Sequence, residues 1–143
     1  MKLFHIHYSR VTKFMLNILD ITFEIAHLSI ILIIVFGWCF KKTRRLSLII
    51  IFITSVSWFG FGWFYGLGYC FLTDYHFQIK RALGEFNLPA SYIKYIVDSV
   101  FSVDSDIAFI DNLTMVLFII SSIFSITLNI KDYLFKRKNK NFQ

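Results

Sequence analysis

The 143-residue chain has few of the residues that punctuate or cross-link small domains. It contains one proline, Pro89, and two cysteines, Cys39 and Cys70. Two cysteines cannot build a disulfide framework, and no glycine- and serine-rich or repetitive stretch offers a linker. We therefore expect a single integral domain over residues 1–143.

The chain also lacks the motifs of common enzymes. It has no Cys-x-x-Cys pair, no phosphate-binding glycine loop and no serine–histidine–aspartate order. Nothing therefore supports a standard hydrolase, nucleotide-binding or redox enzyme. The net charge of +6 would suggest nucleic acid in a soluble protein. Here the basic residues form blocks beside apolar runs, so they predict membrane topology and no nucleic-acid partner.

Apolar residues are what the chain has in excess, since 57% of it is hydrophobic and 20% is aromatic. A helix needs roughly 20 such residues to cross a hydrocarbon core of about 30 Å. Three stretches meet this length, at about 16–40, 46–68 and 107–130. The sequence therefore predicts an all-α membrane protein with three transmembrane helices, in contact with the lipid bilayer.

The charges outside these spans predict an orientation. The connection 41–45 and the tail 131–143 are rich in lysine and arginine, and three spans place both on one side. The segment 69–106 mixes acidic and basic residues and lies on the other side. Because cytoplasmic loops are enriched in lysine and arginine, we expect the N-terminus outside and the C-terminus inside a cytoplasmic membrane. A Cys39–Cys70 disulfide is then excluded, because a membrane thickness separates the two.

The outer segment 69–106 is too apolar for a loop and predicts one or two short amphipathic helices. Thr73 is a candidate cap for the first helix and Gly84 lies near its end. The second begins around Pro89, and acidic residues 104–106 suit the start of the third span. The expected apolar positions are Tyr75, Ile79, Leu83 and Phe86 in the first helix, and Tyr92, Ile93, Ile96 and Val100 in the second.

Asp20, Glu24 and His27 form the most distinctive feature, because spacings of four and three place them on one stripe of the first span. Three readings stay open: interfacial groups with His27 hydrogen-bonded to another helix, a shared buried polar site, or a metal site. Cys70, Asp74 and His76 are expected on the same side and suit a soft or borderline metal such as zinc or copper. A haem is disfavoured, because no second histidine lies at membrane depth. No cofactor is favoured, and a metal remains open.

Small residues predict helix packing. Gly62 and Gly66 form a small-xxx-small face at the end of the second span, and Ser121 and Ser125 form a similar stripe in the third. Such faces let helices approach closely, within the chain or in a homo- or hetero-oligomer.

The chain resembles a family of bacterial membrane proteins, domain of unknown function 2784, over residues 16–100. His27 and Gly37 resemble the family's first-span histidine and glycine. Cys70-Phe71-Leu72-Thr73 resembles its Cys-Pro-Leu-Thr signature, with Phe71 in place of proline. The residues that follow and resemble the family are Arg81, Gly84, Glu85, Tyr92 and Ile93, while His76 stands where a glutamate is expected. The resemblance implies no activity and marks His27 and 70–73 for testing.

Three functions remain open from the sequence. The first is a non-enzymatic accessory or packing component of the membrane. The second is a binding site for a metal, redox group or small ligand built on the polar residues of the first span and the turn 70–76. The third is proton or small-solute passage, which requires an oligomer because three spans make only a narrow path.

Overall fold

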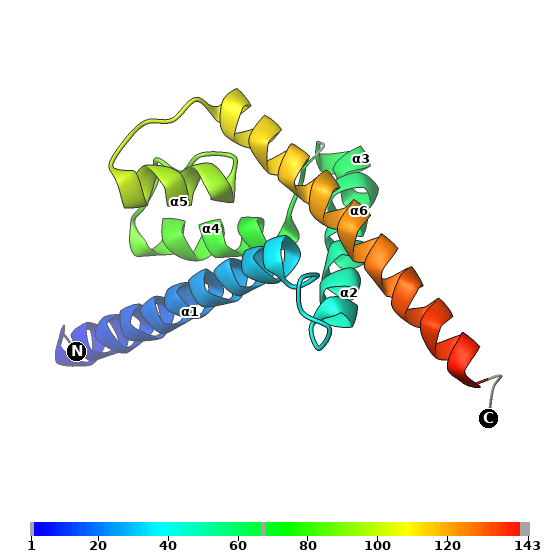
Figure 1. Ribbon diagram of the computed structural model, residues 1–143. Helices are drawn as coiled ribbons and strands as arrows, with labels where there is room; N and C mark the ends of the chain where they lie inside the picture. Colours follow the sequence, from blue (N-terminus) through cyan, green and yellow to red (C-terminus); the bar gives the residue numbers. More distant parts are fainter. Residues whose placement is uncertain (1, 67, 141–143) are drawn as a thin grey trace.

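The computed structural model describes residues 2–66 and 68–140, and in this part of the chain it contains helices and no strand. Figure 1 shows their arrangement. In chain order the elements are α1 (Lys2–Phe36), α2 (Arg44–Ser55), η1 (Val56–Phe61), α3 (Gly62–Tyr65), α4 (Phe71–Leu83), α5 (Tyr92–Phe101) and α6 (Ile107–Lys140).

Three helical stretches are long and apolar enough to cross a membrane: Val11–Phe36, Arg44–Tyr65 and Ile107–Asn139. The predicted fold class is therefore confirmed. The second stretch comprises α2, η1 and α3, where the six residues of η1 form a π-helical segment. Such segments widen the helix locally because each hydrogen bond spans one more residue.

The first and third helices extend beyond their predicted spans. Residues 131–140, expected to be a tail, form the last turns of α6. Two physical reasons account for the extension of α6. No proline or glycine interrupts residues 107–140, and Asp132 is tied to the start of α2.

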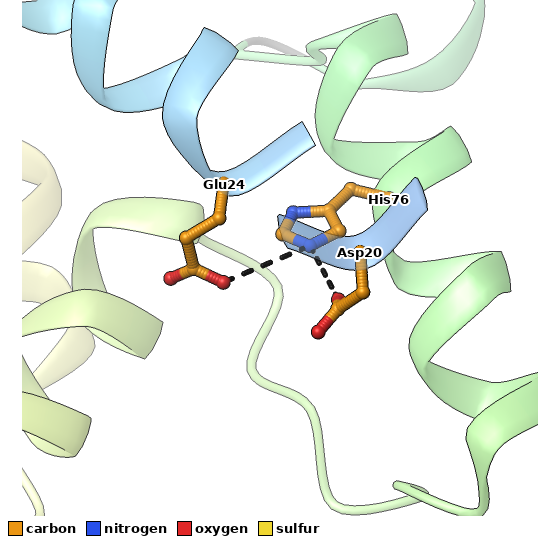
Figure 2. A group of neighbouring side chains, drawn as sticks. All are labelled: Asp20, Glu24 and His76. Atoms are coloured by element: carbon orange, nitrogen blue, oxygen red, sulfur yellow. Dashed lines mark hydrogen bonds and ion pairs between the residues drawn. The ribbon is translucent and has the colours of Figure 1, made fainter. Parts of the chain in front are cut away.

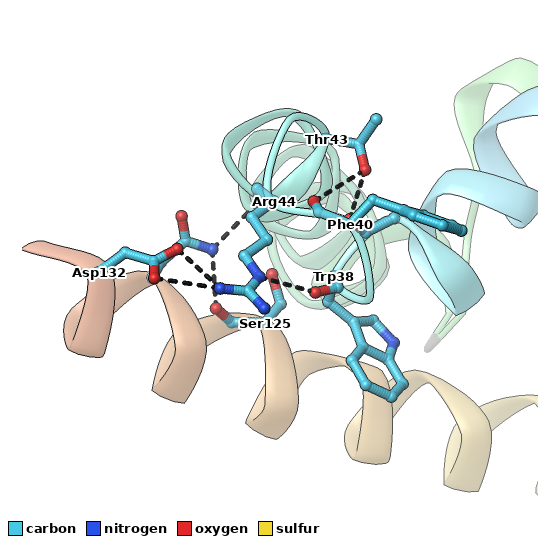
Figure 3. A network of polar contacts seen from close by, with 8 residues as sticks. Trp38, Phe40, Thr43, Arg44, Ser125 and Asp132 are labelled. Carbon is cyan, nitrogen blue, oxygen red and sulfur yellow. Dashed lines mark hydrogen bonds and ion pairs between the residues drawn. The ribbon is translucent and has the colours of Figure 1, made fainter.

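A polar clamp joins the 37–43 turn to α6 (Figure 3). Arg44 donates two hydrogen bonds to the Asp132 carboxylate, at 2.9 and 3.1 Å, and a third from Nε to the Trp38 carbonyl at 3.0 Å. The Asn129 amide donates to the Arg44 carbonyl at 3.1 Å. A bidentate arginine–carboxylate pair fixes orientation as well as distance, so α2 and α6 meet in a defined register.

Apolar and small residues form the contact among the three long helices. Ile34, Ile51 and Phe118 make its buried centre, and the ring of Trp58 lies 4.8 Å from that of Phe118. At the end of α1, a Cβ added to Gly37 would lie 2.4 Å from the Ile33 carbonyl oxygen and 3.0 Å from Cβ of Ser47. Only glycine allows this approach.

Of the predicted packing residues, Gly62, Ser121 and Ser125 are buried. Gly66 is exposed and has a φ of +105°, and an added Cβ there would meet nothing within 4 Å. The prediction that Gly66 packs is therefore wrong within this chain. The residue follows the last turn of α3, and its left-handed backbone ends the helix.

The helices α4 and α5 fill the wedge between α1 and the first turns of α6, and α4 runs beside α1 (Figure 1). Gly84 ends α4 in the left-handed conformation, as predicted. Asp106 caps α6, accepting a hydrogen bond from the Phe109 amide at 2.7 Å. The predicted cap Thr73 is wrong, because α4 begins two residues earlier at Phe71 and the Thr73 hydroxyl faces α1.

Candidate polar site between helices 1, 4 and 5

The polar stripe of α1 is covered by α4 and α5. Three α4 residues at helical spacing, Thr73, His76 and Lys80, are buried on the face that meets α1. They lie against Asp20, Glu24 and His27, and we call these six residues the polar cluster. Its two parts are a carboxylate end around Asp20 and a histidine end around His27.

At the carboxylate end, His76 and Lys80 share the two acidic side chains, and Figure 2 shows His76 with Asp20 and Glu24. Nε2 of His76 lies 2.8 Å from Asp20 and 3.9 Å from Glu24. Because a carboxylate only accepts, the bond to Asp20 places the proton of His76 on Nε2. Nζ of Lys80 lies 3.0 Å from Asp20 and 3.6 Å from Glu24, and Glu85 is a third carboxylate at 3.9 Å.

At the histidine end, Nε2 of His27 lies 3.3 Å from the Thr73 hydroxyl and 3.8 Å from the Cys70 thiol. The His27 ring stacks on Tyr92 of α5, with the ring centroids 3.8 Å apart. The rings of His27 and His76 are 6.4 Å apart, so the two ends are continuous.

The two basic side chains at the carboxylate end are buried, whereas the two acidic side chains are partly exposed. The side chains of His76 and Lys80 are 0% and 3% exposed, whereas those of Asp20 and Glu24 are 19% and 35% exposed. The cluster is therefore reached from its carboxylate side. A buried ammonium is stable only when paired, and here two carboxylates supply the pairing.

The surroundings shift the pKa of one group on α4, Lys80, and of one group on α5, Tyr92. Burial alone would lower the pKa of Lys80, but its contacts with Tyr95 and Asp20 outweigh burial and raise the pKa above its ordinary value. Burial, followed by the nearby charge of Glu24, raises the pKa of the Tyr92 hydroxyl. Lys80 is therefore a fixed cation and Tyr92 a neutral phenol at physiological pH.

Three buried polar atoms around the cluster have no hydrogen-bond partner. They are Nδ1 of His27, Nδ1 of His76 and the hydroxyl of Tyr92. Buried polar atoms of this kind are uncommon and call for an explanation, such as a bound water or ion. All three belong to residues that contact one another, since the Tyr92 ring lies against both histidines.

The structure brings together most of the residues that the sequence singled out. Asp20, Glu24 and His76 meet at the carboxylate end, and His27 meets Cys70 at the other. Asp74 stays apart. Its carboxylate accepts hydrogen bonds from Tyr69 and Gln78 instead. Both cysteines are free.

Sequence reasoning missed Lys80 and Tyr92, and it gave Thr73 the wrong role. Thr73 and Lys80 lie three residues before and four residues after His76, so helical spacing places all three on one face. That signal was present in the sequence. The position of Tyr92 depends on how α5 folds back over α4, and no local spacing reports this.

The donors at the carboxylate end can hold a metal ion. One oxygen of Asp20, one of Glu24 and one nitrogen of His76 all lie within 4.8 Å of one another. Zinc bonds to such donors at about 2.0–2.2 Å, which separates neighbouring ligands by roughly 3.5 Å, so shifts of about 1 Å would close the site. Lys80 now occupies the position of the cation, so metal entry would require Lys80 to move toward Glu85 and the proton of His76 to leave Nε2.

Three apolar helices and a buried polar cluster define a helical protein of the membrane type. The chain belongs to the family described as "Protein of unknown function (DUF2784)", whose model matches residues 17–130. No similar curated protein and no similar solved structure was found. The matched segment contains every residue of the polar cluster.

Proposed function

We propose that this membrane protein is a non-enzymatic component that binds a divalent metal ion of the zinc class through Asp20, Glu24 and His76. The convergence of these three donors from α1 and α4 supports the proposal. Carboxylates and imidazole are all zinc ligands, and a zinc site with three protein ligands keeps its fourth position open. The side chain of Glu24 is 35% exposed, so the ion need not pass through the protein interior to reach the donors.

Lys80 allows a direct test of the proposal, because its ammonium competes with the ion for the same carboxylates. Its ammonium contacts the same two carboxylates. At about 4 Å, like charges in a partly buried site repel by several kcal/mol. Replacing Lys80 by methionine keeps an unbranched side chain, one atom shorter, and removes the charge, so zinc affinity should rise roughly tenfold or more.

The experiment is a zinc titration of the purified full chain in detergent micelles, followed by calorimetry and elemental analysis. Asp20→Asn and His76→Gln should weaken binding by on the order of 100-fold, because even residues that only support a ligand contribute 10–100-fold. Asp74→Asn is the matched control on the same helix and should bind like the wild type. Stoichiometry below one ion in the wild type, together with no gain in Lys80→Met, would refute the proposal.

We also propose that the protein lies in a cytoplasmic membrane with the 37–43 turn and the end of α6 in the cytoplasm. Arg44 and Asp132 hold these two basic segments together. This contact is what we expect if both segments lie on the same side of the membrane. The lysine and arginine bias of this end supports the cytoplasmic side.

An oligomer stays a prediction from the sequence. Ser121 and Ser125 are already buried within the chain, so association would use other faces, and native mass analysis tests it.

Proton passage receives little support from the described residues. The ionisable side chains of the first span end at His27, and residues 28–36 contain none. A proton at the polar cluster would therefore face about three helical turns of apolar side chains before reaching the 37–43 turn.

A further inference from the structure

The end of the molecule opposite the polar cluster carries a concentration of positive charge. Of the fifteen basic residues in the chain, nine lie in 41–45 and 131–140, where Asp132 is the single acidic residue. Asp132 is occupied by Arg44. The exposed cations that remain are Lys41, Lys42, Arg45, Lys131, Lys136, Arg137 and Lys138, which we call the basic end.

The fold holds the two parts of the basic end together. Arg44, next to Arg45 in the chain, bonds to Asp132, next to Lys131. Lys41 and Lys136 lie close enough for their charges to act on Asp132, so cations from the turn and from α6 lie near one carboxylate. No carboxylate in the described part of the chain forms an ion pair with any of the seven.

The length of α6 is sufficient to carry these cations beyond a hydrocarbon core. Its 34 residues span about 51 Å at about 1.5 Å per residue, roughly 20 Å more than a hydrocarbon core. Tyr133 and Phe135 are 66% and 68% exposed beside the cations. Tyrosine prefers the headgroup level of a bilayer, so Tyr133 and the cations beside it suit the last turns of α6 to lie among lipid headgroups.

We propose that the basic end binds anionic phospholipid headgroups, with phosphate groups seated between the 37–43 turn and the last turns of α6. Seven exposed cations without an acidic partner require counter-charges, and headgroup phosphates are the anions available at that depth. Lysine and arginine near a membrane surface each attract anionic lipid by about five-fold in affinity. The proposal is independent of the metal site and holds for either orientation of the protein.

The test is native mass spectrometry of the full chain in detergent, titrated separately with phosphatidylglycerol and phosphatidylcholine. The wild type should retain phosphatidylglycerol preferentially, and 0.5 M salt should reduce the preference. Two variants remove the charges of the two parts separately. The triple variant in the turn is Lys41→Gln, Lys42→Gln, Arg45→Gln. The quadruple variant in α6 is Lys131→Gln, Lys136→Gln, Arg137→Gln, Lys138→Gln. Each should lower the affinity for phosphatidylglycerol at least about tenfold.

The matched control is Lys13→Gln, Arg81→Gln, which removes exposed cations outside the basic end. It should retain phosphatidylglycerol like the wild type, and all variants should keep the wild-type circular dichroism spectrum. Equal retention of both lipids by the wild type would overturn the proposal. So would an equal loss in the control, which would show that net charge, not the basic end, governs binding.

Discussion

Replacing Asp20 by asparagine tests whether the polar cluster holds α4 against α1. Asparagine keeps the shape of the side chain but leaves Lys80, 3% exposed, without its nearest carboxylate at 3.0 Å. Breaking a buried ion pair costs about 3–5 kcal/mol. Glu24 remains at 3.6 Å from the ammonium, and Asp20 itself is 19% exposed, so we expect a loss of about 2–3 kcal/mol.

The assay is reversible unfolding in mixed micelles, followed by circular dichroism with a chelator present so that metal binding does not contribute. Asp74→Asn, outside the cluster, should change the free energy of unfolding by less than about 0.5 kcal/mol. The double variant Asp20→Asn, Lys80→Met should recover most of the loss, because it removes the unpaired charge. If Asp20→Asn costs no more than Asp74→Asn, or if the double variant recovers nothing, the buried ammonium of Lys80 does not depend on Asp20 for its stability.

Three further predictions address other parts of the molecule. Gly37→Ala should lower the free energy of unfolding by about 1–3 kcal/mol, because the methyl group would overlap Ile33 and Ser47. Gly60→Ala, whose Cβ would meet only a side-chain atom at 3.7 Å, should be close to neutral in the same unfolding assay. Hydrogen bonds from Lys94 and Ser105 lower the pKa of Asp98 to about 2 from an ordinary 3.8. The stability that Asp98 contributes is therefore present above pH 4 and lost between about pH 4 and 2, and proteolysis of the α5–α6 connection should show this loss in the wild type but not in Asp98→Asn. In intact cells, a membrane-impermeant maleimide should label a variant retaining only Cys70 and spare one retaining only Cys39; the opposite pattern would reverse the proposed orientation.

Long apolar runs made the three spanning helices predictable, because a membrane helix satisfies its backbone internally and needs only length and composition. Local chemistry also predicted that α4 ends near Gly84 and that residues 104–106 begin α6, where Asp106 forms the cap. The extension of α6 through residues 131–140 was not predictable in this way. The absence of proline and glycine permits the extension, but the contact of Asp132 with Arg44, 88 residues away, cannot be seen in the local sequence.

The candidate site was predictable in part for the same reason. The spacing of Asp20, Glu24 and His27 on one helix predicted a polar stripe, because helical periodicity is a local property. That His76 of α4 would reach Asp20, 56 residues away, follows from the packing of α4 on α1. The distance between the two positions in the sequence contains no such information.

The face that α4 turns toward the protein carries polar residues that an amphipathic helix in water would expose. An amphipathic helix in water buries its apolar stripe, and the sequence named Tyr75 and Phe86 among the apolar positions of this helix. Both are instead exposed, at 60% and 77%, while His76 and Lys80 are buried. The surface of α1 that α4 covers carries carboxylates, and a charged stripe beside lipid is costly unless polar groups cover it. The partner surface therefore decided which face of α4 was buried, and the same requirement explains why a lysine can be buried there at all.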